Sequence, residues 1–202
     1  MTYIVCGWHT PDYDPWVGPL RQSLDRVGAP HDFVRVEKLA GGWERNTLRK
    51  PAMIIQAMRR HPRKTVIFLD VDALVHGSLD ELADISTDIG LHMRMGLDRL
   101  GKPRLGMRTG TMVVCPTDST KIFLRRWAEI SNEARRGMVD QNTLVMALAR
   151  TPELSITNLS VTFCATAADG VHNPVVAHDR ASAAATWPSR WAKQVRRISG
   201  IW

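Results

Sequence analysis

The stretch TVIFLDVDALV, residues 65–75, places two aspartates directly after an apolar run. Thr65–Leu69 is β-branched and apolar on both sides, which predicts a central strand buried on both faces. Asp70 and Asp72 follow it, and residues i and i+2 of an extended chain point the same way. Ligands of α/β sheets bind beyond the carboxyl ends of the strands. We therefore expect the two carboxylates to belong to a ligand site.

Strand and helix patterns alternate before this stretch. Apolar residues at helical spacing predict a helix over Trp16–Val27, which Gly28 ends. Lys50–Arg60 is also predicted to be helical, with Pro51 in its first turn. The other segments expected here are the strands Tyr3–Gly7 and His31–Val36 and a glycine-containing loop, Leu39–Trp43. This alternation favours a parallel α/β sheet.

The second half of the chain has a less regular pattern. The predicted helices run from Thr117 or Asp118 to about Arg135 and over Asp140–Ala149. The predicted strands are Asp88–Met95, Thr111–Cys115, Leu154–Thr157 and Pro174–His178. A loop rich in Gly, Arg and Lys is expected over Gly96–Arg108, and a basic helical pattern over Ala183–Ile198 is interrupted at Pro188. No repeat or linker is present, so we expect one domain.

Composition bounds the class of protein. A chain of 202 residues with 44% hydrophobic and 23% charged residues is typical of one globular core. Its apolar runs are too short to span a bilayer, and its N-terminus lacks the pattern of a secretory signal. Three scattered cysteines indicate free thiols in a reducing cytosol, so a cytoplasmic location is expected. The net charge of +7 fits an anionic partner, although solubility explains it equally well.

The carboxylate pair has more than one interpretation. Two converging carboxylates suit Mg²⁺ or Mn²⁺, which in turn binds phosphate oxygens. IFLDVDALV superficially resembles the motif of haloacid-dehalogenase-like phosphatases. It departs from that motif at Ala73 and Leu74, about sixty residues of strand–helix pattern precede it, and no later acidic motif follows. The phosphatase is therefore an alternative with less support.

Several segments in order resemble the GT-A glycosyltransferases, a superfamily of nucleotide-diphospho-sugar transferases. They are IVCGW, LRQSLDRVGAP, WERNTLRKP, VIFLDVDALV, RTGTMVVCPT, the Trp in FLRRWAEI, DQNTL and PVVAHDRAS. The resemblance implies a single GT-A domain with a Rossmann-like, mixed and mostly parallel sheet flanked by helices. Residues 1–95 would form its nucleotide-binding half, and residues 96–202 would bind the acceptor and complete the metal site.

The resemblance also implies roles for particular residues. The donor nucleotide-sugar would contact Val5, Cys6, Gly7, Trp8, Arg45, Asn46, Lys50, Asp70, Val71, Asp72, Thr109, Gly110 and Thr111. The metal ligands would be Asp70, Asp72 and His178, with His172 as a nearby competitor for the last position. Asp140 and Gln141 would lie at the reacting sugar, where Asp140 is a candidate general base or sugar-hydroxyl ligand. Asp140 is equally suited to capping a helix.

The implied activity is metal-dependent transfer of a hexose from a nucleotide diphosphate, with UDP as the family-level expectation. The acceptor would be a hydroxyl of a glycan, lipid or protein, and the pattern slightly favours retention of configuration. An alternative is a DNA- or RNA-modifying glycosyltransferase that uses the basic segments Arg94–Arg108 and Arg190–Arg197. Trp187 and Trp191 could add stacking, and the tail could touch an anionic membrane surface. A non-enzymatic nucleotide-sugar-binding protein is the third possibility.

Overall fold

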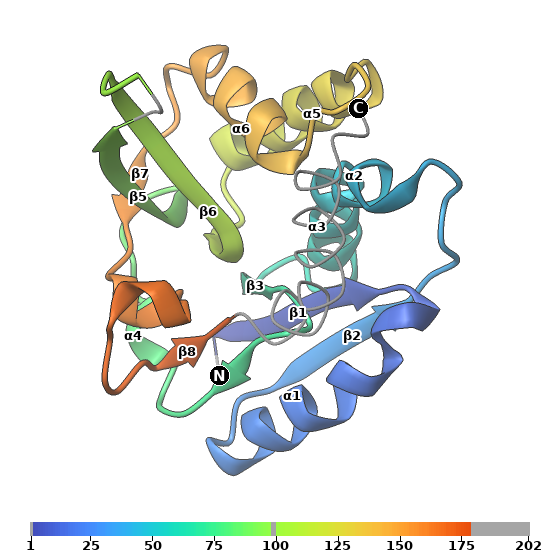
Figure 1. Cartoon of the computed structure of the whole chain (residues 1–202). Coiled ribbons are helices and arrows are strands. Elements are labelled where there is room, and N and C mark those ends of the chain that lie inside the picture. The colour runs from blue at the N-terminus through green and yellow to red at the C-terminus, as the bar shows by residue number, and fades with distance from the viewer. Residues whose placement is uncertain (1, 98–99, 179–202) are drawn as a thin grey trace, which may run out of the picture.

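A mixed six-stranded sheet forms the centre of the computed structural model, which describes residues 2–97 and 100–178 (Figure 1). Its order is β2-β1-β3-β6-β5-β7. The strands are β1 (Tyr3–His9), β2 (His31–Arg35), β3 (Thr65–Leu69), β5 (Ile89–Leu97), β6 (Pro103–Val114) and β7 (Ile156–Asn158). Three neighbouring pairs, β1–β2, β1–β3 and β5–β7, are parallel, whereas β6 is antiparallel to both β3 and β5. The mixed, mostly parallel sheet is confirmed.

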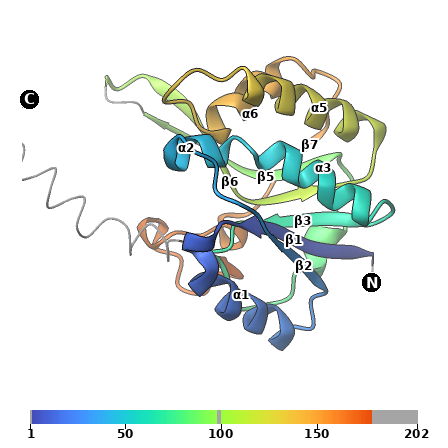
Figure 2. The same ribbon diagram turned by 90° about the vertical axis from the view of Figure 1, so that its right-hand side faces the viewer.

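Helices cover both faces of the sheet (Figure 2). On one face lies α1 (Asp14–Arg26), together with α4 (Asp80–Ala83) and a short antiparallel ribbon of β4 (Leu74–Val75) and β8 (Val176–Ala177). On the other face lie α3 (Lys50–Arg60), α5 (Asp118–Asn132) and α6 (Asp140–Ala149), with α2 (Gly42–Thr47) leading into α3. The described residues also form short 3₁₀ turns, which are η1 (Pro11–Tyr13), η2 (Val161–Phe163) and η3 (Ala167–Asp169).

Strand β3 divides the core into two layers. Ile67 and Leu69 pack with α1 on one face, while Val66 and Phe68 pack with α3 and α5 on the other. All five residues of β3 are buried. This two-sided burial is why the strand is apolar throughout rather than alternating, as predicted.

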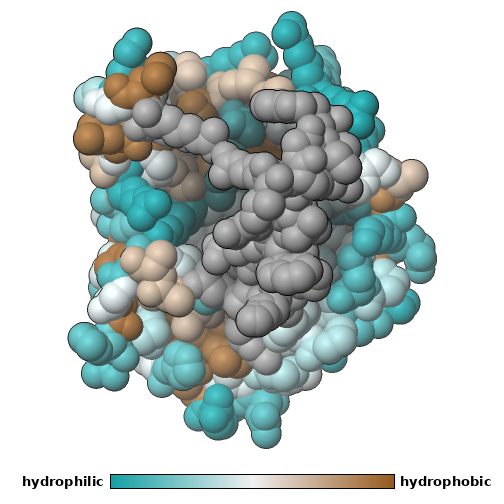
Figure 3. Space-filling model, viewed as in Figure 1, coloured by the Kyte–Doolittle hydropathy of each residue, from teal (hydrophilic) through white to brown (hydrophobic). Residues whose placement is uncertain are grey.

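The prediction of a loop over Gly96–Arg108 is wrong, because most of this segment belongs to two β-strands. β5 extends to Leu97 and β6 begins at Pro103, and the two strands form a long antiparallel hairpin. Glycine, arginine and lysine have low strand propensity, but main-chain pairing continues because Met93 and Met107 pack against the core. Closer to the tip of the hairpin, the side chains of Met95 and Leu97 are 70% and 73% exposed. Figure 3 shows apolar surface on the side of the molecule where the hairpin lies.

The predicted helices Lys50–Arg60 and Asp140–Ala149 are confirmed with the same bounds. Helix α2 begins at Gly42, inside the segment predicted as the loop Leu39–Trp43, and α5 ends at Asn132 rather than near Arg135. Within residues 2–97 and 100–178, the structure contains no helix with the length and apolar character that a membrane span requires. The basic segments predicted over Ala183–Ile198 and Arg190–Arg197, including Trp187 and Trp191, lie outside the described residues.

Candidate active site

A buried lysine connects three segments that are far apart in the sequence. Lys50, in the first turn of α3, is only 4% exposed. Its Nζ lies 2.8 Å from Oδ2 of Asp140 and 3.0 Å from Oδ1 of Asp70. It also donates hydrogen bonds to the carbonyl and hydroxyl oxygens of Thr109, and that hydroxyl donates to Asp140 at 2.7 Å. We call Lys50, Asp70, Thr109 and Asp140 the lysine cluster.

Charge in the lysine cluster is balanced unevenly. Burial alone would lower the pKa of Lys50, but the carboxylates of Asp140 and Asp70 raise it above its usual range, so the ammonium form is favoured. The pKa of Asp70 is also raised, mainly by burial and further by the Asp72 and Asp140 carboxylates, against the opposing effect of Lys50. One ammonium thus faces two carboxylates, and Asp72 adds a third negative charge near Asp70, which leaves this part of the molecule formally negative.

A second group lies at the same strand end, on the α1 side. Nδ1 of His178 lies 3.8 Å from Oδ1 of Asp72, and Nε2 of the same ring lies 2.9 Å from the hydroxyl of Thr111. The ring also packs over Gly110, where a Cβ would come within 2.9 Å of its Cε1. Thr111 and Gly110 therefore hold the imidazole with one nitrogen directed towards Asp72. We call Asp72 and His178 the open pair.

An irregularity in β6 separates the lysine cluster from the open pair. Pairing with β5 jumps from Leu91–Met112 to His92–Arg108, so residues 109–111 have no partner in β5. The carbonyl of Gly110 instead accepts a hydrogen bond from the amide of Asp70 at 2.8 Å. Bulges re-aim side chains, and this one directs the Thr109 hydroxyl to Lys50 and the Thr111 hydroxyl to His178.

The open pair is suitable for holding a divalent cation. A separation of 3.8 Å is too long for a hydrogen bond. Two ligands of one octahedral ion with bonds of about 2.1 Å lie about 3.0 Å apart when adjacent and about 4.2 Å apart when opposite. The observed distance falls in that range, and the negative charge of Asp70 and Asp140 nearby favours a cation. Both carboxylate oxygens of Asp70 lie near Lys50, at 3.0 and 3.2 Å, so the ammonium competes with a cation for them.

The predicted base-pocket residues on β1 lie in different surroundings. Val5 and Cys6 are 0% and 1% exposed, and they pair with Ile67 and Phe68 before the strand end. Gly7 has no room for a side chain, because a Cβ would lie 2.5 Å from the carbonyl oxygen of Leu69. Trp8 is the member of this predicted set that is not fully buried, so it is the one best placed to touch a ligand. The role of all four remains a prediction.

Cys6 has polar neighbours of its own. Its sulfur and the ligand atoms of Asp32 and His61 lie within 4.8 Å of one another. Burial raises the pKa of Cys6 to about 12, so the thiol is protonated at neutral pH. Asp32 already accepts from Arg60 at 2.8 Å and contacts His61 at 2.9 Å. These contacts satisfy the carboxylate without a metal.

The other predicted residues lie around the lysine cluster rather than in it. Asn46 is 7% exposed, and its amide group hydrogen-bonds to Leu39 and Gly42, which closes the loop that leads into α2. Arg45 is exposed and lines a pocket, while Gln141 lines a hollow of about 600 Å³ beneath the β5–β6 hairpin. Val71 is buried against the α1 face and contributes packing.

Tyr13 lies near the carboxylates and was missed by sequence reasoning. Burial raises its pKa, and the carboxylates of Asp72 and Asp70 raise it further. The available signal was weak: Tyr13 follows the first strand, where a ligand-binding loop of an α/β sheet is expected.

Comparisons with known proteins identify the fold. No protein-family model matches the chain, and no curated protein matches it. Solved structures do match: a glycosyltransferase involved in glycosylation of the major capsid of PBCV-1 superposes with a TM-score of 0.68 at 16% identity, over 88% of this chain and 92% of that one. The glycosyltransferase GlyE of Streptococcus pneumoniae TIGR4 matches with a TM-score of 0.58 at 13% identity, over 88% of this chain and 54% of GlyE. An active-site mutant of LgtC matches with a TM-score of 0.52 at 12% identity, over 87% of this chain and 86% of that one.

These matches define the class of fold. The chain has the GT-A fold and is structurally similar to GT-A glycosyltransferases over about 88% of its length, so the resemblance predicted from the sequence is confirmed at this level. The chain spans about half the length of GlyE.

Proposed function

We propose that this protein is a glycosyltransferase that moves a sugar from a nucleotide diphosphate, UDP by the family-level expectation, to an acceptor hydroxyl. One observation carries the proposal. Lys50, Asp70, Thr109 and Asp140 meet in one cluster, and Asp72 faces His178 beside it, although these residues come from five separate segments. The GT-A fold supports the same conclusion.

In this proposal Asp72 and His178 hold a divalent cation, Mn²⁺ or Mg²⁺. Such an ion neutralises the diphosphate leaving group when it is bound. Asp70 lies between the open pair and Lys50, where it can accept a hydrogen bond from the ribose or join the ligands of the cation. Thr111 keeps the His178 ring in place through its contact with Nε2.

Asp140 is better suited to binding a sugar hydroxyl than to acting as a strong base. Lys50 and Thr109 both contact its Oδ2, and no contact to Oδ1 is found in the described part of the chain. The Lys50 ammonium at 2.8 Å and the Thr109 hydroxyl at 2.7 Å already occupy Oδ2, so that oxygen is engaged and is poorly placed to take a proton from an acceptor hydroxyl. Oδ1 can then accept from the donor sugar. In the transfer the bond from the anomeric carbon to the diphosphate oxygen breaks and a bond to the acceptor oxygen forms. The hydroxyl proton leaves to the released diphosphate, a course that agrees with the preference for retention.

Donor binding provides the direct test. Native protein would be screened by thermal unfolding with UDP-, GDP-, dTDP- and CMP-sugars, each with and without Mn²⁺. A ligand that binds only the folded state raises the unfolding temperature, so one nucleotide is expected to do so in a Mn²⁺-dependent way. Hydrolysis of the same donor would then be followed as nucleotide release. If no nucleotide-sugar changes the unfolding temperature, with Mn²⁺ or without it, the proposal fails.

The alternatives receive less support from the described residues. In the basic segment Arg94–Arg108, Arg108 makes two short hydrogen bonds to Asp169, and Arg94 lies 3.8 Å from the same carboxylate. Part of the charge offered to nucleic acid is therefore neutralised internally. A gel shift at low salt would test the nucleic-acid acceptor, since such binding depends steeply on salt. The GT-A fold gives the phosphatase no further support.

A further inference from the structure

A pocket of about 480 Å³ opens between α2 and the loop that joins α5 to α6. Three arginines line it: Arg45 from α2, and Arg135 and Arg136 from the loop. Among the described lining residues Glu44 is the one acidic side chain, so together they carry a formal charge of +2. Among the described residues, none of these four side chains forms an ion pair. In the described part of the chain, the arginines of this lining therefore have no carboxylate paired with them in an ion pair.

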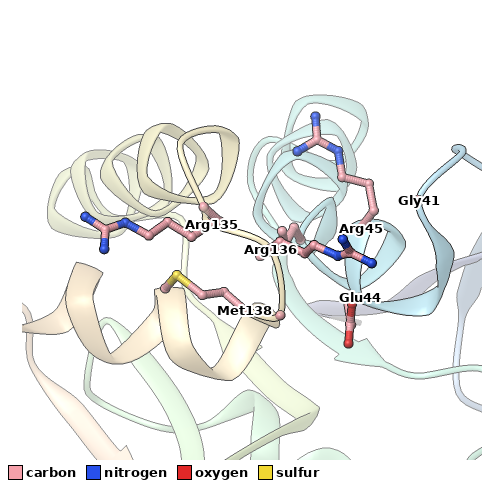
Figure 4. A pocket seen from close by; sticks show the side chains of 9 residues that line it. Gly41, Glu44, Arg45, Arg135, Arg136 and Met138 are labelled. Atoms are coloured by element: carbon pink, nitrogen blue, oxygen red, sulfur yellow. The ribbon is translucent and has the colours of Figure 1, made fainter.

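The arginines do not all point the same way. Figure 4 shows Arg136 reaching from the loop towards α2, the side from which Arg45 and Glu44 come. Arg135 extends in the opposite direction, away from α2. Arg45 and Arg136 thus extend from the two elements that border the pocket, and the neighbouring Arg135, which points away from α2, supplies a comparison of the same residue type.

The position of this arginine pocket relates it to the reacting groups. Its lining includes Leu48 and Met138, which lie two residues before Lys50 and Asp140 respectively. Those two residues make the 2.8 Å ion pair of the lysine cluster. The open pair lies on the other side of the cluster, since Asp72 is flanked by residues of the α1 layer whereas α3 and α6 form the opposite layer.

The cation proposed at the open pair and the arginine pocket, on opposite sides of the lysine cluster, would each attract an anionic group. The donor diphosphate belongs with the open pair in the proposed function. The arginine pocket is then available for a second anion. Because the acceptor is the other substrate of the transfer, we assign this anion to the acceptor. Guanidinium groups suit phosphate because they offer paired, planar donors.

We propose that the arginine pocket binds a phosphate group of the acceptor, so that Arg45 and Arg136 position the acceptor hydroxyl beside Asp140. This inference rests on the proposed function, and it assigns Arg45 to the acceptor instead of the donor contact that the resemblance implies. The pocket volume fits a small phosphate-bearing group, as in a sugar phosphate or a glycerol phosphate headgroup. Glu44 lowers affinity for the phosphate itself and can accept a hydrogen bond from a neighbouring hydroxyl, which favours a phosphate attached to a polyol.

Binding is tested first with inorganic phosphate, on the full chain and without donor. NMR signals of the arginine Nε–Hε groups would be followed as phosphate replaces chloride at constant ionic strength. Saturable shifts are expected for Arg45 and Arg136 and not for Arg135. Arg136→Gln should weaken phosphate binding by about tenfold or more, since hydrogen bonds to charged groups are the strong ones. Arg135→Gln should weaken it much less than Arg136→Gln, because only the nearby charge is lost and no contact, and Glu44→Gln should strengthen it because a repulsive charge is removed.

The acceptor is tested next by transfer from the donor found in the thermal screen. Glucose 6-phosphate and glycerol 3-phosphate would be compared with glucose and glycerol, and vesicles of phosphatidylglycerol with vesicles of phosphatidylcholine. A higher kcat/KM for the phosphorylated member of one pair is expected, and its ratio to the unphosphorylated member should fall about tenfold in Arg136→Gln but not in Arg135→Gln. The soluble pairs and the vesicle pair distinguish a sugar or polyol phosphate from a lipid headgroup.

Failure of this inference can be told from failure of the proposed function. Donor hydrolysis by the native protein without saturable phosphate binding overturns the phosphate site alone. Equal shifts of all three arginines, or equal use of phosphorylated and plain acceptors, do the same. Preferential transfer to a single-stranded oligonucleotide would replace the small phosphate-bearing acceptor by nucleic acid. Phosphate binding without any donor binding would sink the proposed function and, with it, the acceptor role.

Discussion

The lysine cluster and the open pair lie at the end of the same strand but are built in opposite ways. In the lysine cluster, short contacts of 2.8 to 3.2 Å surround one buried ammonium. In the open pair, Asp72 and His178 face each other at 3.8 Å, too far apart for a hydrogen bond. The first arrangement pairs one ammonium with two carboxylates through short contacts, while the two groups of the second do not hydrogen-bond to each other. We infer that the first holds the site in shape and that the second receives a ligand.

Removing the Lys50 ammonium should have the largest effect on the free energy of unfolding. Lys50→Met would leave the buried Asp140 and the partly exposed Asp70 without their cation, at a cost of about 3–5 kcal/mol in the free energy of unfolding, most of it from Asp140. Urea unfolding would measure it. The triple variant with Asp70→Asn and Asp140→Asn should recover much of the loss, because the buried charges are gone. A loss below about 1 kcal/mol in Lys50→Met would contradict a closed, stabilising cluster.

A substitution in the open pair should affect activity strongly and stability little, the opposite of what is expected for Lys50. Asp72→Asn is expected to lower the transfer rate by about 10²–10³-fold, because a group that stabilises the charged leaving group is lost. It should change the unfolding free energy little, and it should abolish the Mn²⁺-dependent part of nucleotide binding. Asp118→Asn, at a side chain 91% exposed, is the matched control. Undiminished turnover in Asp72→Asn would remove the open pair from the mechanism.

A subtler change tests whether the position of His178 matters. Gly110→Ala would place a methyl group 2.9 Å from the imidazole and push the ring away from Thr111. We expect transfer to fall about tenfold to a hundredfold, since displacements of about 1 Å at a reacting site have effects of that size. Steady-state kinetics over a range of Mn²⁺ concentrations would show a higher metal requirement. The same metal dependence as the native protein would show that the ring position is not important.

The pair Arg108–Asp169 extends the comparison to pH. It is closed like the lysine cluster, and its hydrogen bonds from Arg108 hold the pKa of Asp169 well below its usual range. A lowered folded pKa adds stability above the unfolded value of about 4, and that stability is lost as the pH falls below it. Asp169→Asn should therefore cost about 1–2 kcal/mol at neutral pH. Urea titrations at several pH values should show this difference shrinking below about pH 4, and a constant difference would contradict the assignment.

Much of the fold could be predicted because local patterns agree with tertiary structure there. The apolar run Thr65–Leu69 is the central strand, and Lys50–Arg60 and Asp140–Ala149 are helices with the predicted bounds. The hairpin was missed because residues 96–108 have the composition of a loop. Its pairing depends on partners such as Met93 and Met107, which contact the core through the rest of the fold.

The sequence predicted which residues belong to the candidate site but not which of them contact one another. Asp70, Asp72, Lys50 and Asp140 were expected from the resemblance, and the structure brings them to one strand end. That Lys50 is shared between two carboxylates depends on where helices α3 and α6 cross the sheet, which sequence spacing does not reveal. The arginine pocket was invisible for the same reason, because Arg45 and Arg136 belong to segments about ninety positions apart in the numbering.

The irregular segment at residues 109–111 has a consequence for how this site can change over evolution or in the laboratory. Point substitutions there exchange one hydroxyl at a time, whereas deleting a residue would shift every later residue of β6 by one position. Because side chains alternate along a strand, Met112 and Val113 would exchange core layers. The chain length between Arg108 and Met112 is therefore expected to tolerate amino-acid replacement far better than insertion or deletion.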